Sequence, residues 1–412
     1  MHVLILSQYF LPETGATTNR IVSLAKGLQQ RGHRVTVVTA KPNHPEGVVP
    51  EEYQGGLIRR DEQDGIPTIH TAVYTTPKTT FATRILNYTT FMASAVLGAV
   101  RAEGNVDVVL ASSPPLFVGP AGWIAARLLR APFVFDVRDL WPDLAVAMNE
   151  LNDPSKIWLA KRLEHFIYHR ADAITAVTDG FCDAIQSVTG PSKPMKRVMN
   201  GTVPSIFQRD AAREPLRKEL GIDDRFVVTY AGNIGICQGL DHILDAAEEL
   251  QARGKDDILF RMIGSGPVKD QLRKEAERRD LGNLEFHPRV SLDEAAAHMS
   301  AADALLVPLA RHEIYCSFIP SKLFDSMAAG RPVLLSVDGE SRAILERAEA
   351  GRYYEAEDGA ALAREVEWMN DHPDAAKTMG ARGREFAATH CTRAVQADRM
   401  VDFLETLVPA SA

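Results

Sequence analysis

Short apolar runs rich in β-branched residues alternate with longer helical patterns from one end of this chain to the other. That alternation is typical of a parallel sheet covered by helices. With 412 residues the chain is too long for one ordinary core, so we expect two doubly wound α/β domains of ~100 to 200 residues each. The expected strands are 3–6, 35–39, 106–111, 133–137 and 173–177 in the first half and 226–231, 259–263, 304–307 and 333–336 in the second.

Between the two halves, residues 202–215 show no helical or strand period and carry two prolines, which indicates a linker. Near the end of the chain, residues 393–407 have apolar side chains at helical spacing. We therefore expect an N-terminal domain of residues 1–203, a second domain of residues 204–385, and a C-terminal helix within 386–412 that crosses back onto the first domain.

Charge and cysteine content limit the class of partner and the compartment. The formal charge of −8 argues against nucleic acid, because binding to a phosphate backbone usually requires a basic surface. The four cysteines include no Cys-x-x-Cys pair, which indicates free thiols in a reducing compartment and no zinc site. Because the first residues also lack the pattern of a secretory signal, we expect a cytoplasmic protein.

One segment suggests a membrane. Residues 85–100 are uncharged but fall short of the ~20 residues needed to span a bilayer. They predict either a buried helix or a helix that dips into the membrane interface. In the second case the contact would extend over residues 78–101, where Lys78, Arg84 and Arg101 would meet anionic lipid at the cytoplasmic face of the membrane.

Ligands of open α/β sheets bind beyond the carboxyl ends of the strands, so the loops there should hold the chemistry. After the first strand comes LPETGATTNR, in which Gly15 permits close approach of a ligand and Thr17 or Thr18 can cap a helix that ends near Gln30. The exposed amides at such a helix start can bind an anion or a hydroxyl group.

The segment FDVRDLWPDL places three charges directly after the fourth strand. Buried charges are costly unless they are paired, so Asp136, Arg138 and Asp139 should form a network or face the ligand. The alternative is a pair between Arg138 and Asp136 that only braces the loop.

The second half opens with a strand followed by AGNIGICQGLDHIL, in which Gly232, Gly235 and Gly239 surround a tight loop before a helix. Backbone amides and the helix dipole at such a loop can bind phosphate. The spacing is not Gly-x-Gly-x-x-Gly, and no ribose-binding acid follows ~20 residues later, which disfavours a nicotinamide dinucleotide. The turn IGSGP brings Gly264 and Gly266 to the same edge of the sheet.

The most informative segment is YCSFIPSKLFDSMAAGRPVLLS. Pro320 and Ser321 should start a helix, so that Lys322 and the first amides can together bind a diphosphate. Asp325 lies on the same face and could accept hydrogen bonds from two ribose hydroxyls. The alternative is a capped core helix with an exposed lysine.

Taken in this order, the segments resemble glycosyltransferase family 4 of the GT-B fold over nearly the whole chain. The resemblance rests on LPETGATTNR with GHRVTVVT, MNGTVPSIF, AGNIGICQGL, IGSGP and IPSKLFDSMAAGRPVL. The FDVRDLWPD and IPSKLFD forms are most similar to bacterial members that assemble surface polysaccharides, including N-acetyl-fucosamine transferases. The resemblance implies two Rossmann-like domains facing across a cleft.

The family resemblance also implies roles for particular residues. The second domain would bind a nucleotide diphosphate sugar, with Lys322 on the diphosphate, Asp325 on the ribose and the backbone near Arg289 and Val290 on the base. The first domain would bind the acceptor. The expected catalytic residues are Asp139, Lys322 and Ser317, and the remaining expected binding positions are Gly15, Ala16, Arg138, Asn233, Gly235, Gln238, Gly264, Gly266, Ile319, Pro320 and Ser321.

The sequence departs from the family pattern at two places. The family has a second acid eight positions before Asp325, but this chain has Ser317 there. Either Ser317 with its neighbouring amides contacts the sugar, or Glu313 substitutes for the acid. The family often has Arg or Lys in the glycine loop, where this chain has Asn233 and Gln238. Lys322, with Arg138 or Arg289, would then carry more of the phosphate charge.

These features predict a retaining glycosyltransferase that moves a hexose or N-acetylhexosamine from a UDP-sugar to a lipid-linked glycan. No Asp-x-Asp motif is present, and helix ends with Lys322 can replace a cation, so we expect no required metal or other cofactor. Two alternatives are a nucleotide-sugar epimerase of the same architecture and a catalytically silent protein that binds the sugar nucleotide.

Overall fold

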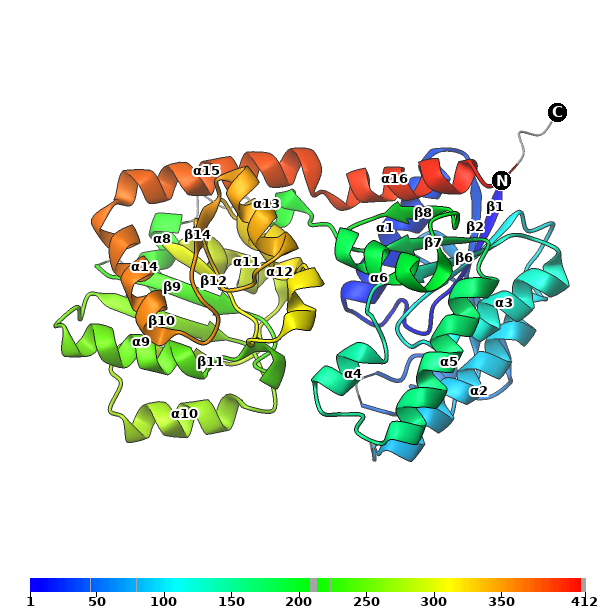
Figure 1. The fold of residues 1–412 in the computed structure, drawn as a ribbon, viewed down its shortest axis with the longest axis horizontal. Coiled ribbons are helices and arrows are strands. Elements are labelled where there is room, and N and C mark those ends of the chain that lie inside the picture. The colour runs from blue at the N-terminus through cyan, green and yellow to red at the C-terminus, as the bar shows by residue number, and fades with distance from the viewer. Residues whose placement is uncertain (45, 79, 208–212, 223, 409–412) are drawn as a thin grey trace. The chain divides into compact units, whose positions relative to one another are not determined.

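The computed structural model describes residues 1–44, 46–78, 80–207, 213–222 and 224–408. The chain divides into two compact units (Figure 1). Unit 1 comprises residues 1–200 together with the chain from residue 393 onward, and unit 2 comprises residues 201–392. Each unit is a sheet of parallel strands covered by helices, which confirms the expected fold class.

In the described residues, the sheet of unit 1 has eight strands in the order β3-β4-β2-β1-β5-β6-β7-β8, and all neighbours are parallel except β3 and β4. The chain winds outward from β1 to one edge and from β5 to the other, so the topological switch point lies between β1 and β5. The strands are β1 (His2–Leu6), β2 (Arg34–Ala40), β3 (Ile58–Gln63), β4 (Ile66–Thr71), β5 (Val108–Ser112), β6 (Phe133–Val137), β7 (Ala173–Ala176) and β8 (Met195–Arg197).

The sequence analysis did not predict the hairpin that β3 and β4 form. Asp64 and Gly65 connect the two strands, both with positive φ, at 53° and 76°. An Asp-Gly pair in this conformation is the favoured two-residue turn between antiparallel strands. The dipeptide was therefore a usable signal, but the strand β3 carries Arg, Asp and Glu side chains that hid its alternation.

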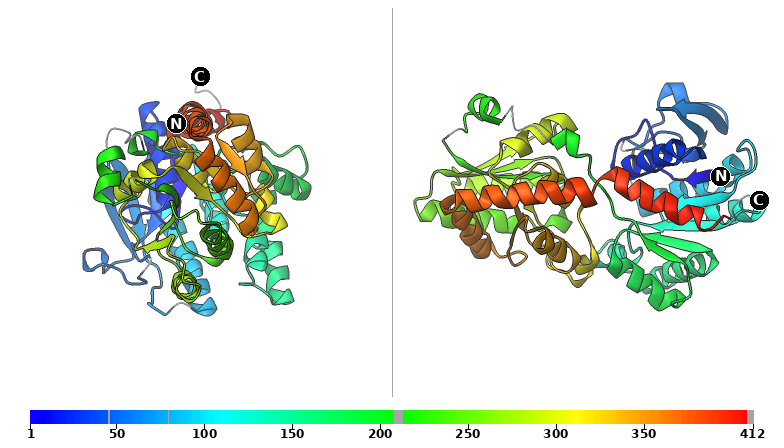
Figure 2. Two further views of the ribbon diagram at one scale, coloured as in Figure 1. Left: turned by 90° about the vertical axis from the view of Figure 1, so that its left-hand side faces the viewer. Right: turned by 90° about the horizontal axis from the view of Figure 1, so that it is seen from above.

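Helices cover the sheet of unit 1, and the last helix of the chain packs beside the first one. Gly27 permits this contact, because a Cβ there would lie 3.0 Å from the Cβ of Ala397. Met400, Val401 and Leu404 are buried with residues of β1 and β2. The right-hand view shows the last helix, in red, running beside the first helix, in blue (Figure 2). The helices of unit 1 are α1 (Ala16–Gln30), α2 (Phe81–Ala99), α3 (Val118–Leu129), α4 (Asp143–Ala147), α5 (Pro154–Arg170), α6 (Asp179–Thr189) and α16 (Arg393–Glu405), with the 3₁₀ turn η1 (Glu51–Tyr53).

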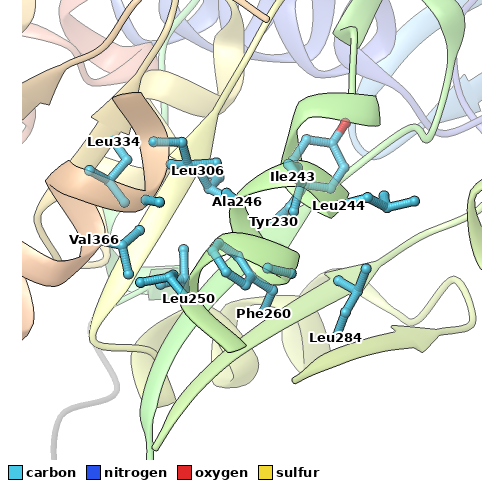
Figure 3. Packing of buried hydrophobic residues seen from close by; sticks show 14 of the residues in the cluster. Tyr230, Ile243, Leu244, Ala246, Leu250, Phe260, Leu284, Leu306, Leu334 and Val366 are labelled. Carbon is cyan, nitrogen blue, oxygen red and sulfur yellow. The ribbon is translucent and has the colours of Figure 1, made fainter. Parts of the chain in front are cut away.

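Unit 2 has a described sheet of six parallel strands in the order β11-β10-β9-β12-β13-β14, and its switch point lies between β9 and β12. Its core joins side chains from the strands, such as Phe260 and Leu306, to helix residues such as Leu250 and Val366 (Figure 3). The strands are β9 (Phe226–Ala231), β10 (Ile258–Ile263), β11 (Leu284–His287), β12 (Ala304–Val307), β13 (Val333–Leu335) and β14 (Gly351–Tyr353).

Helices surround this second sheet as well, and a short 3₁₀ turn follows each of the two central strands, β9 and β12. The helical elements are α7 (Pro204–Phe207), α8 (Arg213–Glu219), η3 (Ile236–Gln238), α9 (Asp241–Ala252), α10 (Lys269–Arg278), α11 (Leu292–Ala301), η4 (Glu313–Ser317), α12 (Ser321–Ala328), α13 (Glu340–Ala348), α14 (Gly359–Asp371) and α15 (Pro373–His390).

The unit boundaries differ slightly from the expected ones. The chain passes from unit 1 to unit 2 between Asn200 and Gly201, and it returns between Thr392 and Arg393. The expected linker 202–215 contains α7 and the start of α8, while residues 208–212 lie outside the described residues. The expected division at 385/386 falls inside α15, because that helix continues to His390 before α16 begins.

Candidate active site

In unit 2, the loops that follow the strands β9 and β10 are bonded to each other. The amide of Gly232 donates to the carbonyl of Ile263 at 2.9 Å, and the amide of Ile234 donates to the carbonyl of Ser265 at 2.9 Å. These bonds continue the sheet pattern beyond the strand ends. The glycine loop and the IGSGP turn therefore form one continuous edge beyond the carboxyl ends of β9 and β10.

Gly264 and Gly266 are required by this close contact. A Cβ at Gly264 would overlap the carbonyl oxygen of Gly232, and a Cβ at Gly266 would overlap that of Ile234. Gly264 also has φ of +151°, which L side chains rarely adopt. The structure thus brings both predicted glycines to the expected edge and gives them a backbone role that the sequence did not reveal.

Lys269, which the sequence analysis did not consider, holds the same edge from the first turn of α10. Its Nζ donates to the carbonyl of Gly264 at 2.7 Å and also to the carbonyl of His287 at the end of β11. A lysine at the first position of the helix directly after IGSGPV was the available signal for this role.

Lys322 lies at the start of α12, which begins at Ser321 with Pro320 as its N-cap residue, as expected. Its Nζ donates to the hydroxyl of Tyr230 at 2.7 Å and lies 4.1 Å from the centre of that ring. The Tyr230 hydroxyl donates in turn to the carbonyl of Asn233. The ammonium group is thereby fixed next to the glycine loop, since a Cβ at Gly232 would lie 3.0 Å from it.

This environment alters the acidity of the lysine. Burial lowers the pKa of Lys322 to about 7, because the charged form loses hydration. Its side chain is half-buried, so the alternative of an exposed lysine on a capped core helix is wrong. An anion bound beside Lys322 would stabilise the charged ammonium that burial disfavours. A diphosphate subsite requires a cationic group of this kind.

A hydrogen bond to the Gln238 side chain stabilises the conformation of the glycine loop. Gln238 at the end of η3 accepts a hydrogen bond from the amide of Gly235 at 3.1 Å. The next residue, Gly239, ends the turn with φ of +57°. Gln238 therefore shapes the loop, whereas Asn233 is exposed at its tip.

Ser317 and Glu313 are the two ends of η4, which follows β12. The Ser317 hydroxyl donates to the carbonyl of Ile314 at 2.9 Å, and Glu313 is exposed. The loop before η4 is joined to the glycine loop, because the amide of Ala310 donates to the carbonyl of Cys237 at 2.9 Å. Both substitutes for the missing acid thus lie in a turn connected to the glycine loop.

The remaining predicted positions of unit 2 surround this edge. Ile319 precedes α12, and Asp325 lies one helical turn after Lys322 with a half-buried side chain. Arg289 is exposed and Val290 is half-buried in the loop between β11 and α11. All of these residues come from connections at the carboxyl ends of parallel strands or from the helix α12.

In unit 1, Asp136 at the end of β6 is completely buried and fully paired. Its carboxylate accepts two bonds from Arg20 of α1, at 2.8 and 3.1 Å, and one each from Ser112 and Thr175 at 2.8 Å. Burial alone would raise the pKa of Asp136, but the charge and hydrogen bonds of Arg20 outweigh it and lower the pKa. Arg20 was missed by the sequence analysis.

Arg138 does not bond to Asp136, so the alternative prediction that these two residues pair to brace the loop is wrong. Its Nη2 donates to the hydroxyl of Thr17 at 2.7 Å, and its Nε donates to the carbonyl of Ser113 after β5. Arg138 therefore joins the start of α1 to the end of β5 at the switch point. The prediction that Thr17 or Thr18 caps α1 is wrong, because the N-cap residue is Gly15 and no side chain caps it.

Asp139, Gly15 and Ala16 are the remaining predicted site positions of unit 1. Burial raises the pKa of Asp139 to about 6, and the charge of Arg138 only partly offsets that effect. A Cβ at Gly15 would meet nothing within 4 Å, so neither packing nor backbone conformation requires a glycine there. Ala16, the first residue of α1, is also exposed.

Two cavities open beside this switch point, and both are bordered by Tyr9, Arg84 and Tyr88. One has a volume of about 320 Å³ and the more polar lining, and the other has a volume of about 250 Å³ and a mainly apolar lining. The first is also lined by Asn43, His44, Gly47, Tyr74, Thr76, Thr83 and Asn87, and the second by Ile85, Pro114, Pro115, Leu116, Phe117, Trp141, Ala145, Glu150 and Leu151.

Within the described ranges, no three or more His, Cys, Asp or Glu side chains are grouped so that they could hold a metal ion. Two basic groups lie at the strand ends of unit 2, Lys269 on the carbonyls of Gly264 and His287 and Lys322 with the amides at the start of α12 beside it. The first amides of a helix have no carbonyl partner within the helix and carry the positive end of its dipole.

Comparison with known proteins agrees with this geometry. Residues 15–201 match the family model described as a glycosyl transferase 4-like domain, and residues 212–386 match the one described as glycosyl transferases group 1. A protein of Escherichia coli (strain K12) is 25% identical over 82% of this chain and 84% of its own length. It carries the provisional name colanic acid biosynthesis glycosyl transferase WcaI. A GDP-mannose-dependent alpha-mannosyltransferase of Mycolicibacterium smegmatis (strain ATCC 700084 / mc(2)155) is 23% identical over 85% of this chain and 84% of its own length.

Among solved structures, HepE of Anabaena in complex with UDP-glucose superposes with a TM-score of 0.72 at 16% identity, covering 99% of this chain and 100% of that one. This likeness shows a common fold. The two family models together match most of the chain, in the order expected for a GT-B protein. The chain therefore belongs to glycosyltransferase family 4 and is a glycosyltransferase of the GT-B fold.

Proposed function

We propose that this enzyme is a retaining glycosyltransferase that transfers a hexose or N-acetylhexosamine from a UDP-sugar to a lipid-linked glycan during surface polysaccharide assembly. The observation that carries the proposal is the position of Lys322. Its ammonium group lies beside Gly232 and is held by Tyr230, at the switch point where α/β sheets bind their ligands. The relative named for colanic acid biosynthesis supports a polysaccharide product.

The reaction would break the bond between the anomeric carbon and the diphosphate oxygen and form a bond from that carbon to an acceptor hydroxyl oxygen. The acceptor proton would pass to the departing phosphate. Negative charge grows on that phosphate in the transition state, and Lys322 with the first amides of α12 would stabilise it. In unit 1, Asp139 would lie near the reacting sugar as a polar group.

The acceptor is proposed to bind in unit 1, where the two cavities beside Tyr9 and Tyr88 differ in polarity. The polar cavity suits sugar hydroxyls, and the apolar cavity, with Phe117 and Trp141 in its wall, suits an aromatic or aliphatic aglycone. A lipid-linked glycan carries both kinds of group. Phe117→Ala should therefore raise the KM for a lipid-linked acceptor more than the KM for the donor.

The nucleotide base and the metal requirement belong to the same proposal. One relative is named for its dependence on GDP-mannose, whereas HepE was solved with UDP-glucose, so both bases need to be compared. Lys322 and the helix amides would supply positive charge at the diphosphate, and we propose that no metal ion is required. Full activity in the presence of a chelator is the expected result, and loss of activity that Mg²⁺ or Mn²⁺ restores would contradict it.

The direct test is a transfer assay with a panel of UDP- and GDP-sugars and lipid-linked acceptors. The expected product keeps the anomeric configuration of the donor, which NMR spectroscopy of the purified product determines. Inversion at the anomeric carbon would contradict the retaining mechanism. Conversion of the donor sugar without an acceptor would instead indicate the epimerase, and tight donor binding without any turnover would indicate the silent binding protein.

A further inference from the structure

Three neighbouring helices of unit 1, α2, α3 and α5, contain almost no acidic side chains (Figure 1). Glu164 of α5 is their single acidic residue. It is buried and accepts a bond from Lys161 at 2.9 Å. These helices therefore expose no carboxylate, although the whole chain has a formal charge of −8. Their basic residues are Arg84, Arg127, Lys156, Lys161, Arg162 and Arg170.

The outer side of α5 also exposes large apolar side chains. Trp158 is 60% exposed and Leu159 is 63% exposed. Phe166 lies two turns after Trp158 and is exposed as well. Exposed apolar groups gathered on one helix in this way are uncommon on a soluble monomer and mark contact surfaces. We call Trp158, Leu159, Phe166, Arg162 and Arg170 the α5 surface.

Arginines lie against the aromatic rings of this surface. The guanidinium of Arg162 lies 4.9 Å from the Trp158 ring, and that of Arg170 lies 5.5 Å from the rings of both Phe166 and Trp123. The side chains of α5 also line a depression of about 700 Å³ in which Lys161, Arg162 and Arg170 are the charged members. Apolar and cationic groups thus share one side of one helix.

The helix α2, which the sequence singled out, is mainly a packing element. Phe91, Ala95 and Ala99 are completely buried. Among the side chains of residues 82–100, all of which the structure describes, the exposed large apolar ones are Leu86 at 44%, Leu97 at 45% and Val100 at 42%. None of the described helices is long and apolar enough to cross a bilayer. A membrane contact through unit 1 would therefore involve α5 more than residues 78–101.

We propose that the α5 surface docks on a lipid bilayer that carries anionic headgroups. Tryptophan, leucine and phenylalanine would enter the headgroup and upper acyl region, while Arg162 and Arg170 would meet lipid phosphates. The absence of acidic side chains from the described surface of these helices makes the charge complementary to such a membrane. Docking does not depend on the identity of the sugar donor, so it can be tested separately from the transfer reaction.

The test is cosedimentation of the full-length protein with vesicles of phosphatidylcholine alone and with added phosphatidylglycerol. We expect strong binding only to the anionic vesicles, and weaker binding at high salt because the headgroup charge is screened. Arg162→Glu with Arg170→Glu should reduce the partition coefficient by at least about tenfold, and Trp158→Ser with Leu159→Ser should reduce it by a similar factor.

Two matched variants in unit 2 serve as controls. Leu292→Ser removes another exposed leucine, which is 51% exposed, and Arg273→Glu reverses an exposed charge on α10. Both should bind vesicles like the wild type. Tryptophan fluorescence adds a local readout, since anionic vesicles should shift the emission of the wild type to shorter wavelength and this shift should be lost in Trp158→Phe.

Equal binding to neutral and anionic vesicles would overturn the proposal, as would equal losses in the control and α5 variants. A wild-type dimer in solution that the α5 variants convert to a monomer, with no vesicle binding, would assign the surface to a second copy of the chain instead. Circular dichroism spectra and melting temperatures that match the wild type show that each variant is folded, so that lost binding reports on the surface.

Discussion

Lys322 and Tyr230 form the central pair of the proposed donor site. The sequence identified the lysine from its place at a helix start, but it did not identify the tyrosine, because only the loops after the strands were expected to hold the chemistry. Tyr230 is buried in the core of unit 2, yet its hydroxyl bonds both Lys322 and the carbonyl of Asn233. A buried tyrosine normally needs a partner for its hydroxyl, and this requirement was the unused signal.

The lowered pKa of Lys322 predicts how nucleotide affinity changes with pH. With a pKa of about 7, the lysine is mostly neutral above that value, so a diphosphate must recruit a proton to bind. The affinity for UDP should therefore be highest below pH 7 and fall by up to about tenfold per pH unit above it until the pKa of the bound complex is reached. Calorimetric titrations at pH 6, 7, 8 and 9 in two buffers of different ionisation enthalpy measure this directly.

A variant without the titrating group should lack this pH dependence. Lys322→Met keeps the apolar stem of the side chain and removes the ammonium group, so its weak affinity for UDP should not change in this way between pH 6 and 9. A wild-type affinity that is flat between pH 6 and 9, without proton uptake, would show that Lys322 is already charged in the free enzyme.

The raised pKa of Asp139 predicts that a neutral side chain at this position raises the free energy of unfolding at neutral pH. Its pKa is raised to about 6, so the folded protein holds a proton there that the unfolded chain releases at lower pH. The free energy of unfolding should therefore fall as the pH rises from about 4 to about 6. Asp139→Asn should avoid that loss and be more stable than the wild type by about 1 to 2 kcal/mol at pH 7.5, with little difference below pH 4.

Urea denaturation at the two pH values measures the difference for Asp139→Asn. Asp183→Asn, an exposed position on α6, is the matched control and should behave like the wild type at both. A variant that is less stable at pH 7.5 would mean that the surroundings of Asp139 stabilise its charged form, which contradicts a pKa raised by burial.

At the scale of elements, the order and class of the secondary structure follow from the sequence, whereas edge strands do not. Interior strands such as β6 and β9 are mostly apolar, and their observed bounds equal the expected ones. The missed strands β8, β11 and β14 are short and half-buried, so their residues lack a long apolar run. Side-chain networks such as Asp136 with Arg20 join residues more than a hundred positions apart, and one sequence carries no local signal for them.

Substitution of two glycines in strand-end loops distinguishes a structural role from a role in ligand binding. Gly15→Ala adds a Cβ that meets nothing within 4 Å, so it should change the free energy of unfolding by no more than about 0.5 kcal/mol. If a ligand approaches this backbone, the same variant should lower kcat/KM by at least about tenfold. Gly264→Ala should instead destabilise unit 2 by several kcal/mol, about 2 to 4, because its Cβ overlaps the carbonyl of Gly232.

Thermal denaturation and steady-state kinetics on both glycine variants make the comparison. Full activity in a stable Gly15→Ala enzyme would remove the start of α1 from the candidate site. A stable Gly264→Ala protein would contradict the close contact between the glycine loop and the IGSGP turn.

At the scale of the whole molecule, the chain builds unit 1 from both of its ends. The sequence predicted that a C-terminal helix would cross back, and α16 lies in the core of unit 1 with Met400, Val401 and Leu404 buried. The exact crossing points were not predictable, because α15 and α16 are separated by only two residues and no helix-breaking glycine or proline marks the break. Unit 1 therefore cannot complete its core until α16 has been synthesised.

This arrangement predicts a selective loss of stability. Leu404 is completely buried, so Leu404→Ala should destabilise unit 1 by about 2 to 5 kcal/mol, while the exposed Thr406→Ala should have little effect. Amide hydrogen exchange measured by mass spectrometry locates the loss. Protection should fall in β1, β2 and α1 and stay unchanged in β9 and β10. Equal loss of protection in both units would contradict the assignment of α16 to the core of unit 1.

The most direct test of the account is calorimetric titration of UDP and GDP, without added metal, into the wild type, Lys322→Ala and Lys274→Ala. Lys274 is an exposed lysine on α10 of the same unit and serves as the matched control. We predict that UDP binds the wild type and the control equally and that Lys322→Ala loses at least about tenfold in affinity, since it removes a charge-assisted contact worth about 1.5 to 3 kcal/mol. Equal UDP affinity in all three proteins, or no binding of either nucleotide to the wild type, would contradict the placement of the donor diphosphate at Lys322.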